Sequence, residues 1–106
     1  MTTEETAVIN VEKDETLLLV TGKKNASSKD SIKKLANAIL KVFEKYQLVR
    51  LRCVGAAALN NAEKAFIIAK TQAEEKGIEL VQTSSFVTVT FDGQDKTGIM
   101  KEVIAR

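Results

Sequence analysis

Residues 51–65 have the types and spacing best suited to chemistry in this chain, and that chemistry is the binding of phosphate. An apolar run ends at Gly55 and becomes an alanine-rich helix start that carries Asn60, Asn61 and Lys64. A strand that leads directly into a helix presents unpaired backbone N–H groups and the positive end of the helix dipole, which suit an anion. The spacing matches neither common nucleotide-binding loop. The segment therefore indicates a site for a phosphate backbone or a protein partner, with close packing as the alternative.

A pair of lysines is expected at the same end of the sheet. Lys23 and Lys24 follow an apolar run and a glycine, and two parallel strands that each lead into a helix open on the same side. We therefore expect this pair near Gly55, the two alanines that follow it, and Asn60. Two ammonium groups, a helix start and an amide suit phosphate oxygens without strict spacing. The alternative, equally supported by these residues, is a solvated loop and an asparagine that only caps its helix.

Residues that usually perform catalysis or bind metals are scarce. The chain has no histidine, so it lacks the usual general base and the commonest metal ligand. Cys53 is the only cysteine and lies in an apolar run, which indicates a core residue, excludes an internal disulfide and favours a reducing, cytoplasmic location. The carboxylates at 74–75 and at 92 and 95 are interpreted as surface and turn residues. We expect no enzymatic activity, metal, cofactor or small-molecule substrate.

Charge is distributed unevenly along a chain of 106 residues, whose length predicts one domain with a single core. Residues 1–15 contain five acids against Lys13, a balance of −4, which leaves 15 bases against 9 acids, or +6, in residues 16–106. We expect an acidic leader at 1–15 and a basic folded domain at 16–106, which suits a nucleic-acid partner or an ordinary solvated surface. No apolar run predicts a membrane span, and residues 1–5 do not resemble a secretory signal.

Hydrophobic periodicity predicts the elements that position these residues. The first strand is expected to be fully buried, residues 22–28 to form a polar loop, and residues 87–91 to show one face to solvent. Asp92-Gly93 predicts a hairpin turn. Strands are expected at 16–21, 48–54, 78–83 continued by 86–91, and 96–104, with residues 7–11 extending or preceding the first; helices are expected from a serine cap at 27 or 28 to 46, and at 57–76.

The element order β-α-β-α-β-β predicts an α/β (α+β) domain with a mixed four-stranded sheet and two helices on one face. The strand-helix-strand connections imply parallel pairing, and the closing hairpin adds an antiparallel pair. Many alanines let the second helix lie close to the sheet or to a twin subunit. Most aromatic residues fall on apolar stripes, so no base-stacking platform is expected and binding would depend on phosphate and shape; these residues are Phe43, Tyr46, Phe66, Phe86 and Phe91.

Three motifs, in this order on this frame, resemble the Alba-like superfamily over residues 16–106. Residues 20–24, Val-Thr-Gly-Lys-Lys, are similar to the lysine pair after the first strand of archaeal Alba chromatin proteins. Residues 54–65 are more similar to the bacterial stage V sporulation protein S branch, through Gly-x-x-Ala-Leu-Asn-x-Ala-x-Lys-Ala. The Asp-Gly-Gln at 92–94, followed by a threonine and an apolar final strand, is similar to both.

The resemblance implies a homodimer whose lysine loops and hairpin arms hold duplex DNA or structured RNA without sequence specificity, in association with the nucleoid or chromatin. It carries over Lys23 and Lys24 as central contacts, Asn60 and Lys64 as neighbours on the second helix, and Lys96 as a hairpin contact.

Two departures from the archaeal pattern concern arginines. Archaeal members favour arginines beside the glycine after strand two and in the hairpin, whereas Val54 and Ala56 flank Gly55 here and the hairpin offers Gln94-Asp95-Lys96. This favours a weaker or more RNA-selective binder. The alternative is a protein-interaction module of sporulation or another developmental programme, which would recruit a partner through the alanine-rich helix face and the hairpin edge.

Overall fold

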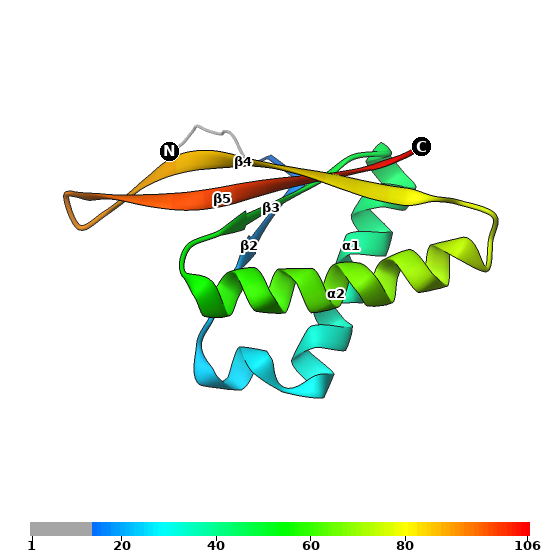
Figure 1. Ribbon diagram of the computed structural model, residues 1–106, viewed down its shortest axis with the longest axis horizontal. Coiled ribbons are helices and arrows are strands. Elements are labelled where there is room, and N and C mark those ends of the chain that lie inside the picture. Colours follow the sequence, from blue (N-terminus) through cyan, green and yellow to red (C-terminus); the bar gives the residue numbers. More distant parts are fainter. Residues whose placement is uncertain (1–13) are drawn as a thin grey trace.

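The structure, a computed structural model, describes residues 14–106 (Figure 1). The strand expected at 7–11 lies outside the described residues. The elements in chain order are β2 (Leu17–Val20), the short 3₁₀ helix η1 (Lys24–Ser27), α1 (Lys29–Tyr46), β3 (Val49–Cys53), α2 (Ala56–Glu74), β4 (Leu80–Phe91) and β5 (Gln94–Ala105).

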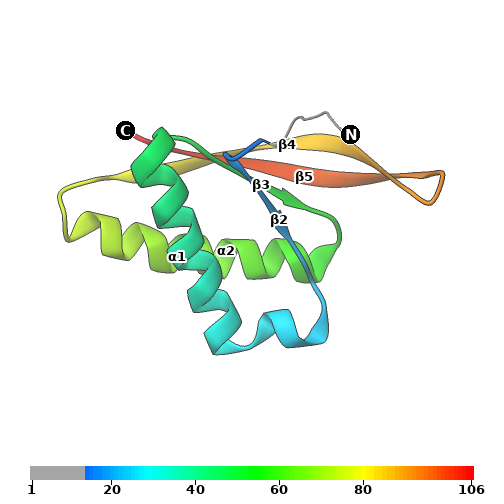
Figure 2. The ribbon, with the colours of Figure 1, turned by 180° about the vertical axis from the view of Figure 1, so that it is seen from behind.

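The four described strands form one mixed sheet in the order β2-β3-β5-β4, and both helices cover the same face (Figures 1 and 2). β2 and β3 are parallel, while β5 is antiparallel to β3 and to β4. The predicted α+β class, with a mixed four-stranded sheet and two helices on one face, is confirmed.

One expected pairing is wrong, because β3 and β4 run in the same direction but do not touch. β5 lies between them: the hairpin folds it back along the whole of β4, from Phe91 opposite Gln94 to Leu80 opposite Ala105. In that central position Val103 is fully buried opposite Val49. The last strand therefore fills the place that a direct β3–β4 pair would have occupied.

The core lies between the sheet and the helices. β3 alternates as a strand covered on one face should, with Val49, Leu51 and Cys53 buried and the arginines between them only partly so. α1 presents the apolar stripe predicted from its three- and four-residue spacing, and its buried members are Ile32, Ala36, Ile39 and Phe43. Ser28 caps this helix as predicted, since its Oγ accepts a hydrogen bond from the Ser31 N–H at 3.1 Å.

The alanine-rich face of α2 is packed against the rest of the domain. Five alanines on this face are at most 3% exposed: Ala58, Ala62, Ala65, Ala69 and Ala73. Small side chains let the helix approach the sheet closely, as predicted. Because this face is buried within the chain, the expectation that it recruits a partner or a twin subunit is wrong.

The edges and the loops of the sheet differ most from expectation. The first strand is not fully buried. Among the described strands β2 has one neighbour, β3, and Leu19 is 64% exposed on the face that the helices leave uncovered.

The polar loop expected at 22–28 contains η1. β4 runs through 84–85 without a break, and it forms with β5 an arm that projects beyond the body (Figure 1). The predicted turn is confirmed, with φ of 49° at Asp92 and 75° at Gly93.

Candidate nucleic-acid interface

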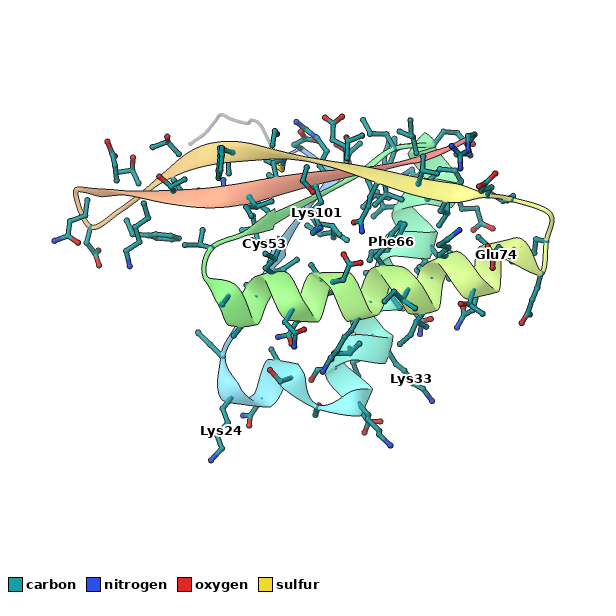
Figure 3. The ribbon with its side chains drawn as sticks, viewed as in Figure 1. Lys24, Lys33, Cys53, Phe66, Glu74 and Lys101 are labelled. Carbon is teal, nitrogen blue, oxygen red and sulfur yellow. The ribbon has the colours of Figure 1, made fainter. Side chains whose placement is uncertain are left out.

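The lysine pair lies where β2 leaves the sheet, and both side chains are exposed. The loop is held by short-range hydrogen bonds, from the Lys23 N–H to Thr21 Oγ1 at 3.1 Å and from the Ala26 N–H to the Lys23 carbonyl at 2.9 Å. Lys24 points away from the body of the molecule (Figure 3). Within residues 14–106 no carboxylate forms an ion pair with Lys23 or Lys24. Both charges therefore face solvent.

The strand-to-helix junction has an uncapped helix start. Gly55 occupies the cap position of α2 with φ of 94°, a conformation that favours glycine, and no side chain caps the helix there. The first turn contains no acid, and Ala56 and Ala57 are exposed. The positive end of the helix dipole thus meets solvent at Ala56 and Ala57, with no acidic side chain in the first turn of the helix.

The lysine loop and this helix start are in close contact. A Cβ added to Gly22 would lie 2.8 Å from the Ala57 Cβ and 2.8 Å from the Ala58 backbone nitrogen. One helical turn along, Asn61 Nδ2 donates a hydrogen bond to the Thr21 carbonyl at 3.0 Å. The start of α2 therefore lies against Thr21 and Gly22, the two residues that precede the lysine pair.

Two neighbouring asparagines on α2 have opposite environments. Asn60 is exposed and does not cap the helix, because Gly55 occupies the cap position; the alternative in which Asn60 serves as the cap is therefore wrong. Asn61 is only 2% exposed and ties α2 to the end of β2. Asn61 was not among the predicted site residues, although its place three residues after Ala58 and four before Ala65 puts it on the buried stripe.

The remaining candidates lie apart from this corner. Lys64 lines a groove between α1 and α2 together with Lys29 and Lys33. Lys96 lies on the hairpin arm, with its Nζ 5.8 Å from the centre of the Phe91 ring. The six candidates therefore form three groups: the corner with Lys23, Lys24, Gly55 and the adjoining Asn60; the groove with Lys64; and the arm with Lys96.

The hairpin arm also exposes aromatic rings. Phe43 and Phe66 are buried in the core as their spacing predicts, but Phe86 is 83% exposed and Phe91 is 47% exposed. The expectation that most aromatics lie on buried stripes fails here, because the arm extends past the helices that would cover it (Figure 1). Alternation in the sequence marks the strand but does not reveal where the covering helix ends.

A polar cluster between α2 and the sheet also escaped the sequence interpretation. Lys101 on β5 is 8% exposed, and its Nζ lies 3.3 Å from Glu63 Oε1 and 3.5 Å from Ser84 Oγ. Gln82 Nε2 donates to the same Glu63 oxygen at 2.7 Å. The sequence signal for this cluster is weak. It consists of one lysine within the alternating pattern of a strand, on the face that meets a carboxylate of a helix. The cluster fixes α2 against the sheet, since a buried cation needs its partner.

The groups considered for catalysis have structural surroundings. Cys53 is 1% exposed, and burial raises the pKa of its thiol, against a smaller opposing effect of the Lys101 charge. Glu74 pairs with Lys70 at 3.0 Å, and Asp95 accepts a hydrogen bond from Thr90 at 2.7 Å, as surface and turn residues do. Residues 14–106 contain no cluster of three metal-ligating side chains. None of the helices in this described part is long and apolar enough to cross a membrane.

Comparison with known families relates the chain to a sporulation family. The model of a family described as Stage V sporulation protein S (SpoVS) matches residues 25–106. The matched region contains η1 from its second residue onward, both helices and β3 to β5, and therefore Gly55, Asn60, Lys64 and Lys96. Lys23 and Lys24 directly precede it. The description refers to sporulation and names no reaction.

Proposed function

The chain belongs to the stage V sporulation protein S family, within the Alba-like superfamily, and on this premise we propose that it is a non-enzymatic protein that binds nucleic acid. It acts as a homodimer, contacts the phosphate backbone of DNA or RNA, and reads little sequence.

The observation that carries this proposal is the contact between the lysine loop and the uncapped start of α2. The Gly22 backbone packs on Ala57 and Ala58, so the loop that carries the two lysines adjoins the start of α2, where Ala56 and Ala57 are exposed. The first turn of α2 contains no acid, and no carboxylate among the described residues neutralises the lysines. Two kinds of phosphate-binding group thus share one corner.

The hairpin arm supplies a second contact. Lys96 adds a positive charge near the exposed Phe91 ring, so the arm offers a cation for phosphate and a flat apolar surface for a base or a sugar. In a homodimer, two corners and two arms would engage one nucleic acid. This increases affinity without requiring any strong single contact.

Removing the two lysine charges tests the proposal. The Lys23→Ala, Lys24→Ala double variant is titrated against labelled duplex DNA, single-stranded DNA and RNA, with fluorescence anisotropy as readout. At about 50 mM salt we expect at least a tenfold loss of affinity, because each lost phosphate contact also loses its counterion release. The slope of log affinity against log salt should fall in magnitude by about 2 for each chain engaged.

A variant with the same loss of charge provides the control. Lys41 and Lys76 are exposed and lie by a different depression, near the C-terminal ends of α1 and α2. The Lys41→Ala, Lys76→Ala variant should keep both the affinity and the salt slope within about twofold. Equal weakening by the two double variants would show that net charge alone acts. Absence of binding to DNA and RNA at low salt would disprove the proposal, and a monomeric mass in light scattering would disprove the homodimer.

A further inference from the structure

A groove of about 480 Å³ opens between the N-terminal half of α1 and the middle of α2. It borders the lysine loop, because Ser27 at the end of η1 also lines it, and of the six candidate residues of the nucleic-acid interface it contains Lys64 alone. The rest of its lining has two parts of different chemistry, an isoleucine floor (Ile32, Ile67 and Ile68) and a lysine rim (Lys29, Lys33 and Lys64).

One residue of the isoleucine floor is open to solvent. Ile67 is 53% exposed, whereas Ile68 is partly buried and Ile32, on α1, is 6% exposed and belongs to the core. Ile67 follows directly after Phe66, which is 5% exposed in the core, so the exposure of Ile67 results from its position on the outer side of α2. An exposed apolar side chain that lies in a groove between two helices offers a binding position for an apolar side chain of another molecule.

The lysine rim surrounds this floor with charge of a single sign. Lys29 and Lys33 are one turn apart on α1, Lys64 is on α2, and all three are exposed. Lys33 points away from the body on the side of α2 opposite the sheet (Figure 3). No ion pair with a carboxylate of residues 14–106 neutralises any of them. The rim therefore attracts carboxylates.

We propose that this groove binds an acidic amphipathic helix of a partner protein. Apolar side chains on one face of that helix would cover the isoleucine floor, and carboxylates at the edges of the same face would meet the lysine rim. A phosphate backbone suits the rim but not the floor, because it has no apolar group that would remove Ile67 from water. The pairing of an apolar floor with a basic rim thus favours a protein partner over a nucleic acid.

A designed peptide probes the groove of the full-length protein. The probe is a fluorescein-labelled helix with leucines at i, i+3, i+4 and i+7 and glutamates elsewhere, and its partner is a peptide of the same composition whose leucines are spread around the helix. We expect saturable binding of the first peptide, measured by anisotropy, and at least about tenfold weaker binding of the second, which cannot bury its leucines together.

Variants of the floor and of the rim then locate the binding. Ile67→Ser should weaken the amphipathic peptide about tenfold through lost apolar burial, and Lys29→Glu with Lys33→Glu should weaken it further, most strongly at low salt. Lys41→Glu, on the same helix but outside the groove, should bind as the unaltered protein does. These are exposed positions, and urea unfolding of each variant verifies that the fold is retained.

Three results would overturn the proposal. Equal binding of the two peptides, or unchanged binding to Ile67→Ser, would mean that charge alone attracts the probe. A loss of DNA or RNA affinity in Ile67→Ser would assign the groove to the nucleic-acid path. The Lys23→Ala, Lys24→Ala variant separates the two proposals, since it should lose nucleic acid and keep the amphipathic peptide.

Discussion

The two sides of α2 differ in how far their side chains are exposed and in what those side chains contact. The inner side carries the buried alanines together with Asn61 and Phe66, and it packs against the rest of the domain. The outer side carries Asn60, Lys64 and Ile67, which are exposed. Residues of similar chemistry occur on both sides, one position apart in the sequence. The side of the helix on which a residue lies, rather than its type, therefore separates residues that build the domain from residues available to partners.

The inner side of α2 supports the fold, and the outer side carries groups that could bind partners. The inner side fixes where the start of α2 lies relative to the lysine loop, through Asn61 and the close approach at Gly22. The outer side supplies the groove and the polar groups that face solvent. Changes on the inner side should lower stability, whereas changes on the outer side should lower affinity and leave stability intact.

Phe66 and Ile67 test this separation with the largest expected effect. Phe66→Ala removes a ring that is 95% buried in the core and should lower the free energy of unfolding by about 3–5 kcal/mol. Ile67→Ala truncates a side chain that is 53% exposed and should cost less than about 1 kcal/mol. Urea unfolding followed by circular dichroism measures both. Similar losses for the two variants would show that the outer side of α2 is also part of the core.

Two ion pairs on α2 give the next contrast. Glu63 lies 3.3 Å from the ammonium of Lys101, whose side chain is 10% exposed. Glu74 pairs with Lys70 at 3.0 Å on the surface. Glu63→Ala leaves the nearly buried Lys101 ammonium without its carboxylate partner and with the Ser84 hydroxyl 3.5 Å away, which should cost about 1–3 kcal/mol. Glu74→Ala should change the stability by about 0.5 kcal/mol or less.

High salt sharpens the same contrast. An exposed pair is screened at about 1 M salt, where the Debye length is about 3 Å, while the Glu63–Lys101 pair, in which the lysine is 10% exposed and the glutamate 45%, is screened less. The effect of Glu63→Ala on the free energy of unfolding should therefore persist at high salt, and that of Glu74→Ala should vanish. Equal sensitivity to salt would mean that Lys101 is accessible to water in solution.

Local signals explain why most of the fold could be predicted from the sequence. The spacing of Ile32, Ile39 and Phe43, the serine before α1, and the Asp-Gly turn each specify an element through contacts within a few residues. The proximity of the lysine loop to the start of α2 followed from the direction of two parallel strands. These features need no knowledge of distant packing.

The features that escaped prediction depend on contacts between distant segments. The central place of β5, the exposure of Leu19 at the sheet edge and the exposure of Phe86 on the arm all depend on which elements cover which. The groove requires α1 and α2 to be adjacent, with Lys29 and Lys33 near Lys64. No local pattern specifies that arrangement, because it is set by how the alanine face of α2 fits the core.

The variants of Asn61 and Asn60 should show the smallest difference in stability, together with a difference in nucleic-acid binding. Asn61→Ala removes the hydrogen bond to the Thr21 carbonyl and should cost about 1–2 kcal/mol. Because this bond ties the end of β2 to α2, the same variant should also weaken nucleic-acid binding, through increased freedom of the lysine loop. Asn60→Ala should leave the free energy of unfolding within about 0.5 kcal/mol and weaken binding only through its own lost contact.

Titrations at temperatures well below unfolding distinguish the two routes to weaker binding. Loop freedom is an entropic cost that leaves the lysine charges in place, so Asn61→Ala should lower the affinity while the salt slope stays unchanged. The double lysine variant should lower both. A destabilising Asn61→Ala variant with full affinity for nucleic acid would show that the loop keeps its position without this bond, and that the inner side of α2 supports the fold but not the site.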